Sequence, residues 1–418
     1  MFPLVFVSIH QHFRTHPQPP RLMFANLDEE KKARLRERIL QAAAAPPPAP
    51  VPAKSNSDSD DEQEVPLQHN ESMKHASEQL TINAKSTEVE IANIRLFTLD
   101  ELDLNQLTEC KILSLRKNLI HELSAFPQHL AGRLTELDLF DNKIRKVRDF
   151  FDSAMVPDPE SGSLLKQSVP QAFYSLTKLD LSYNQLRRIT GLGSLGSTLK
   201  ELYLVENKIK VIEGLDSFVH LELLELGGNR IREIGSGLAN LRSLQSLWLG
   251  KNKIHSIGDS LHSLRELQKL SLQANRLTSI TEEAFKEGCN PHLVELYLSE
   301  NGISTIENLP LHSLHLLDLS FNPIATINET VINPINMPEL EEFWLTDGNI
   351  NDWGEVKKFC GFANTLRTIY VERNPIEQDK RYRDKVYMNL PFVTQIDSWP
   401  VLNKNNLEAD RLIQRRAS

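Results

Sequence analysis

The stretch LYLVENKIKVIEGLDSFVHLELLELGGNRIREI, residues 202–234, decides the fold because it contains one pattern twice. Each copy begins with two leucines that flank one variable residue, and an asparagine follows three places after the second leucine. Leucines at alternate positions are typical of a short strand that buries one face. The variable positions, Tyr203 and Glu225, are 22 residues apart, so the chain repeats a unit of about that length.

The same pattern continues along most of the chain, as LSLRKN, LDLFDN, LDLSYN, LYLVEN, LELGGN, LWLGKN, LSLQAN, LYLSEN and LDLSFN, followed by FWLTDG and IYVERN. From residue 180 to 271 the variable position advances in steps of 23, 22, 23 and 23, inside the range of about 20–29 for leucine-rich repeats. We therefore predict an α/β leucine-rich-repeat solenoid. It should be curved, with a parallel sheet on its concave face and short helices or turns on its convex side.

Asparagine ends this pattern in ten of the eleven units, where its amide can satisfy backbone groups that the turn leaves unpaired. The exception has Gly348 at the asparagine position, and its asparagine, Asn349, comes one residue later. We expect a locally altered turn at this unit.

The repeats do not extend over the whole chain. A proline- and alanine-rich stretch and the acidic run SNSDSDDEQE precede them, and neither can bury a core. Ser57 and Ser59 in this run each have an acidic residue three places downstream, which acid-directed kinases prefer, so we mark both as candidate phosphorylation sites. We predict a disordered tail at 1–85 with a candidate helix at 27–44, a solenoid of about twelve units at 86–373 with a loop inserted at 148–171, a C-terminal cap at 374–401, and a second tail at 402–418.

Composition limits the classes of function. The chain of 418 residues has 25% charged residues and a net charge of −9, which argues against nucleic acid as the main partner. No apolar run approaches the roughly 18 residues that span a bilayer, so we expect no membrane partner. The three cysteines form no CxxC pair and indicate neither disulfides nor a zinc site, and we expect Cys110, Cys289 and Cys360 to be buried.

Catalysis has no support from motifs. The sequence contains no GxxxxGK[ST], GxSxG or HExxH. The histidine pairs have no cysteines or carboxylates at metal-ligand spacing. We predict a protein that is not an enzyme and needs no cofactor or metal.

The residue between the two leucines of each unit should face the concave side, because successive strand residues alternate faces. Five of these residues are aromatic, against 7% in the whole chain, five are acidic and none is Lys or Arg. A general preference of strands for aromatic residues explains one or two of them, whereas a face that binds a basic partner explains the set. This concave column is Glu90, Ser114, Asp138, Asp180, Tyr203, Glu225, Trp248, Ser271, Tyr297, Asp318, Trp344 and Tyr370.

The units in their order, with the ending YVERNPIEQDKRYRDKVYMNLPFVTQID, resemble the leucine-rich-repeat regulatory subunit of type 1 protein phosphatase, the regulatory subunit 7 family. The resemblance covers about residues 88–401. It rests on LELGGNRIREI, LGKNKI, LYLSENGI and EEFWLTD, which share more than the leucines and asparagines of generic repeats.

The resemblance implies a non-catalytic regulator that binds the phosphatase catalytic subunit through the concave face and controls its activity, maturation or targeting. It also implies a small heat-stable inhibitor protein as a further partner, a role in mitosis, and a location in the nucleus and cytoplasm. The family has phenylalanine where this chain has Tyr203 and Trp248. Its contact residues correspond here to Asp180, Tyr203, Glu225, Trp248, Asp318, Glu342, Trp344 and Tyr370, to which the concave column adds Tyr297.

A second hypothesis keeps the binding role but changes the partner. Related repeat proteins with a similar C-terminal cap are adaptors for axonemal or spliceosomal proteins. The concave column discriminates between the two hypotheses, because such adaptors need no aromatic and acidic residues at the matching units.

Overall fold

The computed structural model describes residues 84–401 except 125, 149, 152, 158–163 and 169–171. The predicted tail, its candidate helix at 27–44, and Ser57 and Ser59 lie outside the described residues, as do residues 402–418. No helix in the part of the chain that is described is both long and apolar enough to cross a membrane.

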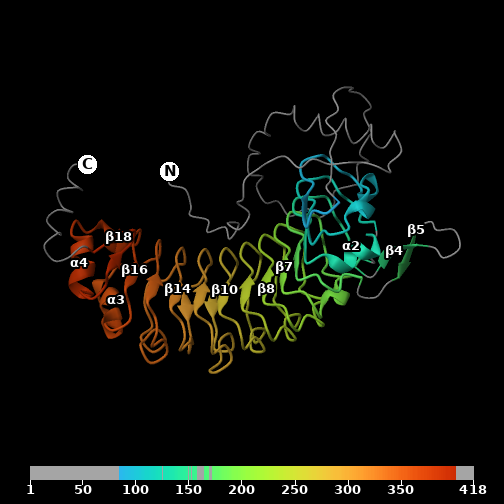
Figure 1. The fold of residues 1–418 in the computed structure, drawn as a ribbon. Helices are drawn as coiled ribbons and strands as arrows, with labels where there is room; N and C mark the ends of the chain where they lie inside the picture. Colours follow the sequence, from blue (N-terminus) through green and yellow to red (C-terminus); the bar gives the residue numbers. More distant parts are fainter. Residues whose placement is uncertain are drawn as a thin grey trace, which may run out of the picture.

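One sheet of fourteen strands runs the length of the described chain (Figure 1), and its strands follow one another in sequence order. Every neighbouring pair is parallel except the last, β17 and β18. The predicted leucine-rich-repeat solenoid is therefore confirmed. The strands are β1 (Glu88–Glu90), β2 (Ile112–Ser114), β3 (Glu136–Asp138), β6 (Lys178–Asp180), β7 (Glu201–Tyr203), β8 (Leu223–Glu225), β9 (Ser246–Trp248), β10 (Lys269–Ser271), β12 (Glu295–Tyr297), β14 (Leu316–Asp318), β15 (Glu342–Trp344), β16 (Thr368–Tyr370), β17 (Gln395–Ile396) and β18 (Trp399–Pro400).

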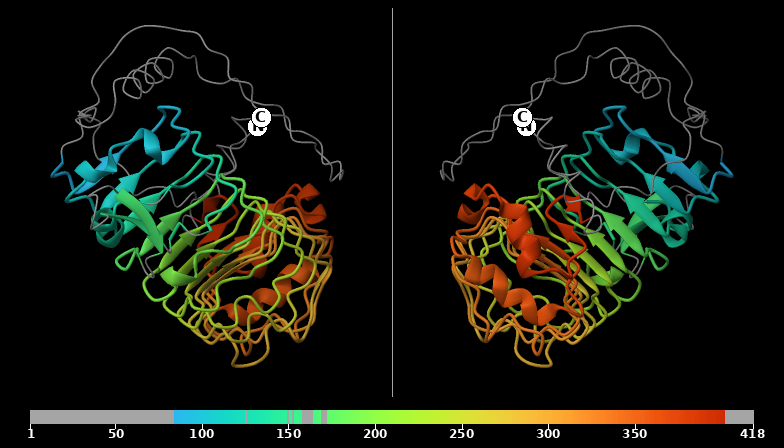
Figure 2. Two further views of the ribbon diagram at one scale, coloured as in Figure 1. Left: turned by 90° about the vertical axis from the view of Figure 1, so that its right-hand side faces the viewer. Right: turned by 90° about the vertical axis from the view of Figure 1, so that its left-hand side faces the viewer.

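The leucines of the pattern form the core. Leu202 and Leu204 are fully buried, and the corresponding leucines of the neighbouring units stack on them. In each repeat, turns and short helices occupy the side opposite the strand (Figures 1 and 2). Because that side is wider than the strand side, the stack of repeats curves. Apart from those of the insertion and the C-terminal cap, the elements outside the sheet are η1 (Leu99–Glu101), η2 (Leu104–Gln106), α2 (Gln128–Arg133), η3 (Gly193–Leu195), β11 (Ser279–Ile280), β13 (Thr305–Ile306), α3 (Trp353–Lys357) and η4 (Lys358–Phe362).

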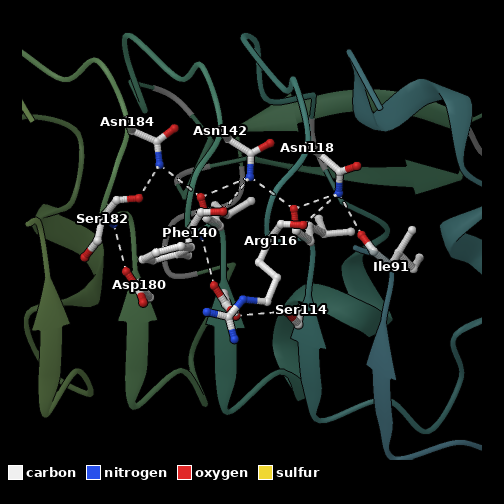
Figure 3. A network of polar contacts seen from close by, with 12 residues as sticks. Ile91, Ser114, Arg116, Asn118, Phe140, Asn142, Asp180, Ser182 and Asn184 are labelled. Atoms are coloured by element: carbon white, nitrogen blue, oxygen red, sulfur yellow. Dashed lines mark hydrogen bonds and ion pairs between the residues drawn. The ribbon is translucent and has the colours of Figure 1, made fainter. Parts of the chain in front are cut away.

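The predicted asparagines form a ladder along one edge of the sheet (Figure 3). Asn142 is typical: its Nδ2 donates to the carbonyls of Leu115 and Leu139, both at 3.1 Å, and its Oδ1 accepts from the amide of Ile120 at 3.0 Å. Each ladder asparagine thus ties its own turn to the preceding unit. Because these side chains are mostly buried, the bonds satisfy backbone groups that water cannot reach.

The unit with Gly348 keeps the ordinary turn, so the prediction of an altered turn there is wrong. Asp347 has φ of 58°, like the residue at this place in the other units, and the Asn349 amide donates to the Ile324 carbonyl at 2.9 Å in the usual register. The hydrogen bond that an asparagine side chain at position 348 would accept is replaced one unit earlier. There the Ile324 amide, which has no asparagine to bind at position 348, donates to the Asn322 carbonyl at 2.7 Å.

The insertion between β3 and β6 differs from the expected loop. It contains an antiparallel pair, β4 (Ser153–Pro157) and β5 (Leu164–Ser168), which projects from the N-terminal half of the solenoid (Figure 1). Four buried rings lie where the insertion leaves and rejoins the core, and their centroids are 4.8 to 5.8 Å apart. These rings are Phe126, Phe150, Phe151 and Phe173.

The C-terminal sequence covers the last unit, and its helices are η5 (Pro375–Gln378) and α4 (Tyr382–Asn389). Val386 and Leu390 are fully buried and continue the leucine core beyond β16. Asp397 then ends the parallel part of the sheet. Its carboxylate accepts from the amides of Val371 and Glu372, and the first of these corresponds to the amide that donates to the next repeat in other units. Its φ of 53° turns the chain into the antiparallel β18.

The cysteine prediction is correct at one position of three. Cys110 is fully buried, and burial raises the pKa of its thiol to about 11. Cys289 is partly exposed and Cys360 is exposed. Both lie in convex segments, which follow no strict repeat, so the pattern did not predict their burial.

Candidate functional site

The concave column is a structural feature as well as a sequence pattern. All twelve residues end a strand of the sheet, and the strand register places each directly beside the next, from Glu90 to Tyr370. The central strand residue points into the core, so the flanking residues share the opposite face. Glu342 begins β15 and therefore lies on the same face as Trp344.

Four aromatic side chains of the column meet above the C-terminal half of the sheet. The ring centroids of Trp248 and Tyr297 are 6.2 Å apart in a stacked arrangement. Those of Tyr297 and Trp344 are 6.4 Å apart, and those of Trp344 and Tyr370 are 5.4 Å apart, both edge to face. We call Trp248, Tyr297, Trp344 and Tyr370 the aromatic cluster.

The rings can meet because smaller side chains separate them. Ser271 lies on the strand between Trp248 and Tyr297, and Asp318 on the strand between Tyr297 and Trp344. Both are nearly buried, at 2% and 6% exposure. Burial raises the pKa of Asp318, whose carboxylate accepts from the Ser320 amide at 2.9 Å. Asp318, which was predicted to contact a partner, is therefore almost buried between Tyr297 and Trp344 in the free protein.

Carboxylates at the first position of the strands hold the aromatic side chains. In three strands a glutamate two residues before the aromatic residue accepts its polar hydrogen, at 2.8, 2.9 and 3.2 Å. Glu201 and Glu295 were not predicted as site residues, although the repeated Glu-x-(Tyr or Trp) spacing was a signal for both. The pairs are Glu201 with Tyr203, Glu295 with Tyr297, and Glu342 with Trp344.

Three predicted residues form a second group, on β6, β7 and β8. Asp180, Tyr203 and Glu225 lie on successive strands. Burial, and then the nearby Asp180 carboxylate, raise the pKa of Glu225 to about 7. Burial and the surrounding carboxylates also raise the pKa of the Tyr203 hydroxyl. Two crowded carboxylates disfavour each other's charge, so this group favours a cation between them.

The face is not free of basic residues, which qualifies its acidic character. Lys178 and Lys269 stand at the first strand position, two residues before the column and on the same face. They form ion pairs with Glu201 at 3.3 Å and with Glu295 at 2.7 Å. Lys178 also lies 5.5 Å from the centre of the Tyr203 ring. Both lysines therefore position the glutamates that hold the aromatic side chains.

The geometry of the concave surface suits binding. Among the described residues, no three His, Cys, Asp or Glu side chains gather in a way that could hold a metal ion. The surface instead offers fixed aromatic area and oriented carboxylates, which suit the recognition of a protein that presents basic side chains.

Comparison with known proteins identifies the class. The leucine rich repeat model matches residues 174–231, 219–277 and 265–324. One chain in the octameric complex of latrophilin 3, Unc5D and FLRT2 (LRR) aligns over 67% of this chain and 81% of its own, with a TM-score of 0.52 and 21% identity. That likeness concerns the fold alone. The chain therefore contains leucine-rich repeats, and its described part has the leucine-rich-repeat fold.

Among curated proteins, the chain is similar to the protein phosphatase 1 regulatory inhibitor subunit PPP1R7 homolog of Arabidopsis thaliana. The two are 34% identical over 161 residues, which is 38% of this chain and 43% of that protein. It is also similar to leucine-rich repeat-containing protein 51 of Rattus norvegicus, at 36% identity over 85 residues, 20% of this chain and 42% of that protein. The matches thus span about two fifths of the length of these relatives.

Proposed function

We propose that this protein is a non-catalytic regulatory subunit that binds the catalytic subunit of type 1 serine/threonine protein phosphatase through its concave face. The observation that carries the proposal is the aromatic cluster with its glutamates, whose four rings lie on four of six adjacent strands. The four rings are partly exposed. Trp and Tyr on such a surface contribute contact area with little loss of side-chain entropy, and they dominate protein interfaces. The partial similarity to a plant phosphatase regulatory inhibitor subunit supports the same partner.

The proposal extends to what the interaction does. Binding would control the activity, maturation or targeting of the phosphatase in the nucleus and cytoplasm, including during mitosis. A small heat-stable inhibitor protein would be a further member of the complex. These statements rest on the sequence resemblance of the repeats and the C-terminal cap.

The test is a pair of matched tryptophan substitutions. Trp344→Ala removes a ring of the aromatic cluster and should weaken binding of the purified catalytic subunit by about 30-fold, since an interface hot spot contributes about 2 kcal/mol or more. Trp399→Ala removes a tryptophan that is 63% exposed on β18, two strands beyond Tyr370. Trp399 pairs with the buried Ile396 and so lies outside the column by register, and its loss should leave the affinity unchanged. Equal affinities for both variants would refute the assigned surface.

The alternative is an adaptor for an axonemal or spliceosomal protein, and the similarity to leucine-rich repeat-containing protein 51 keeps it open. The same experiment separates the two functions. If the wild-type protein does not bind the catalytic subunit at micromolar concentrations, while Trp344→Ala abolishes capture of a different partner, the surface assignment stands and the phosphatase assignment fails.

A further inference from the structure

A second surface lies on the edge of the solenoid where the strands end and the asparagines stand. In five units the residues one and three places after the ladder asparagine include Lys or Arg, as in NKIR, NQLR, NKIK, NRIR and NKIH. A sixth unit adds Arg276, and the pattern then stops, since the next units have Gly302 and Pro323 at the first of these places. The positive charges are therefore confined to the N-terminal and central units.

The central part of this edge borders a hollow of about 1440 Å³. Seven Lys or Arg residues line the hollow, against four Asp or Glu. Two of the four acids are already engaged by residues outside it: Glu213 binds Arg188 at 2.7 Å, and Glu233 lies 3.6 Å from His255. We call the lining residues Lys208, Lys210, Arg230, Arg232, Lys253 and Arg276 the basic edge.

The basic edge is unexpected for a chain with a net charge of −9. It is also separate from the concave face, because its side chains follow the asparagine turn whereas the concave column precedes it. The function proposed above does not use it. Its charge and its open hollow suit an extended acidic segment, which can place successive carboxylates along the positive charges of adjacent units.

The chain itself contains such a segment. Residues 57–64, SDSDDEQE, have five carboxylates in eight residues and are joined to the solenoid through residue 84. We propose that this acidic segment docks in its own molecule on the basic edge, and that phosphorylation of Ser57 or Ser59 tightens the docking. A phosphate would add a charge of about −1.5 to −2 at each serine.

The connection is long enough. Glu64 and residue 84 are twenty steps apart along the chain, and an extended chain spans about 3.3–3.6 Å per step, or up to about 70 Å. From β1 to β10 there are seven steps in the sheet, at about 4.8 Å each, or about 34 Å. The segment can therefore cross the width of the solenoid and still reach the basic edge. Docking within one molecule also has the advantage of a high effective concentration.

Zero-length carbodiimide cross-linking of the full chain, read by mass spectrometry, tests the proposal. Monomeric wild-type protein should give cross-links from residues 57–64 to Lys208 or Lys210. Arg230→Ser with Arg232→Ser keeps both lysines but should lower the cross-link yield about threefold or more, as should 0.5 M salt. Phosphorylation by an acid-directed kinase should raise the yield.

The matched control, Arg242→Ser with Lys286→Ser, removes two exposed positive charges from the convex side and should leave the yield unchanged. The proposal is overturned by equal yields in both double variants, by cross-links to convex lysines instead, or by cross-links found only between two molecules. Circular dichroism of each variant checks folding. No phosphatase is present, so the result is independent of the function proposed for the concave face.

Discussion

The asparagine ladder allows a prediction whose size can be derived from individual bonds. Asn229 is 6% exposed; its Nδ2 donates to the carbonyls of Leu204 at 2.8 Å and Leu226 at 3.0 Å, and its Oδ1 accepts from the Ile209 amide at 3.0 Å. Asn229→Ala removes these three bonds and a longer one to the Gly227 carbonyl at 3.3 Å, and it leaves the partners of the first three buried. At about 0.5–1.5 kcal/mol for each bond, we expect the free energy of unfolding to fall by about 3 kcal/mol.

Urea unfolding gives the total, and hydrogen exchange of the Ile209 amide reports the local effect. Asn240→Ala is the matched control, because the Asn240 amide donates to the Asp216 carbonyl at 3.1 Å in an exposed convex turn. It should cost less than about 0.5 kcal/mol. Equal losses in the two variants, or an unchanged exchange rate at Ile209 in Asn229→Ala, would show that the ladder does not stabilise the stack as argued.

Three further predictions concern the core, the pH dependence and the irregular unit. Phe150→Ala removes a buried ring 5.1 Å from Phe126 and should lower the free energy of unfolding, measured in urea, by about 3–5 kcal/mol. The raised pKa of Glu225 means that the folded chain holds a proton more tightly than the unfolded chain between about pH 4.5 and 7. Stability should therefore fall as the pH rises through that window, and Glu225→Gln should flatten the fall in a series of urea titrations. Gly348→Asn should lower the melting temperature, because a Cβ there would come within 2.8 Å of the Asn374 Oδ1.

The leucine and asparagine pattern was sufficient to predict the solenoid, its sheet and the alignment of the concave column. These features depend on contacts that recur in every unit, so one unit predicts the next. The burial of Asp318 was not predictable in this way, since it depends on the two large rings that the neighbouring strands happen to carry. The hairpin in the insertion and the exposure of Cys360 likewise belong to segments that occur once.

The partner-binding role of the concave column stays a prediction. What the structure adds is the second row of residues, in which Glu201 and Glu295 orient Tyr203 and Tyr297. A search restricted to the position between the leucines omits these glutamates because they lie two places earlier on the same face. Listing the first and third strand positions together would have found them from the sequence.

The way Asp397 ends the sheet has a consequence for how such a chain can change in length during evolution. Its carboxylate takes the Val371 amide hydrogen, which a following parallel repeat would otherwise bind, and the chain then turns back into the antiparallel β18. A duplicated repeat added after this aspartate would find no parallel strand edge with which its own strand could pair. At this end a new unit fits better between existing ones, where both faces of a repeat are already complementary to its neighbours, so the array can grow from within while its C-terminal end remains the same.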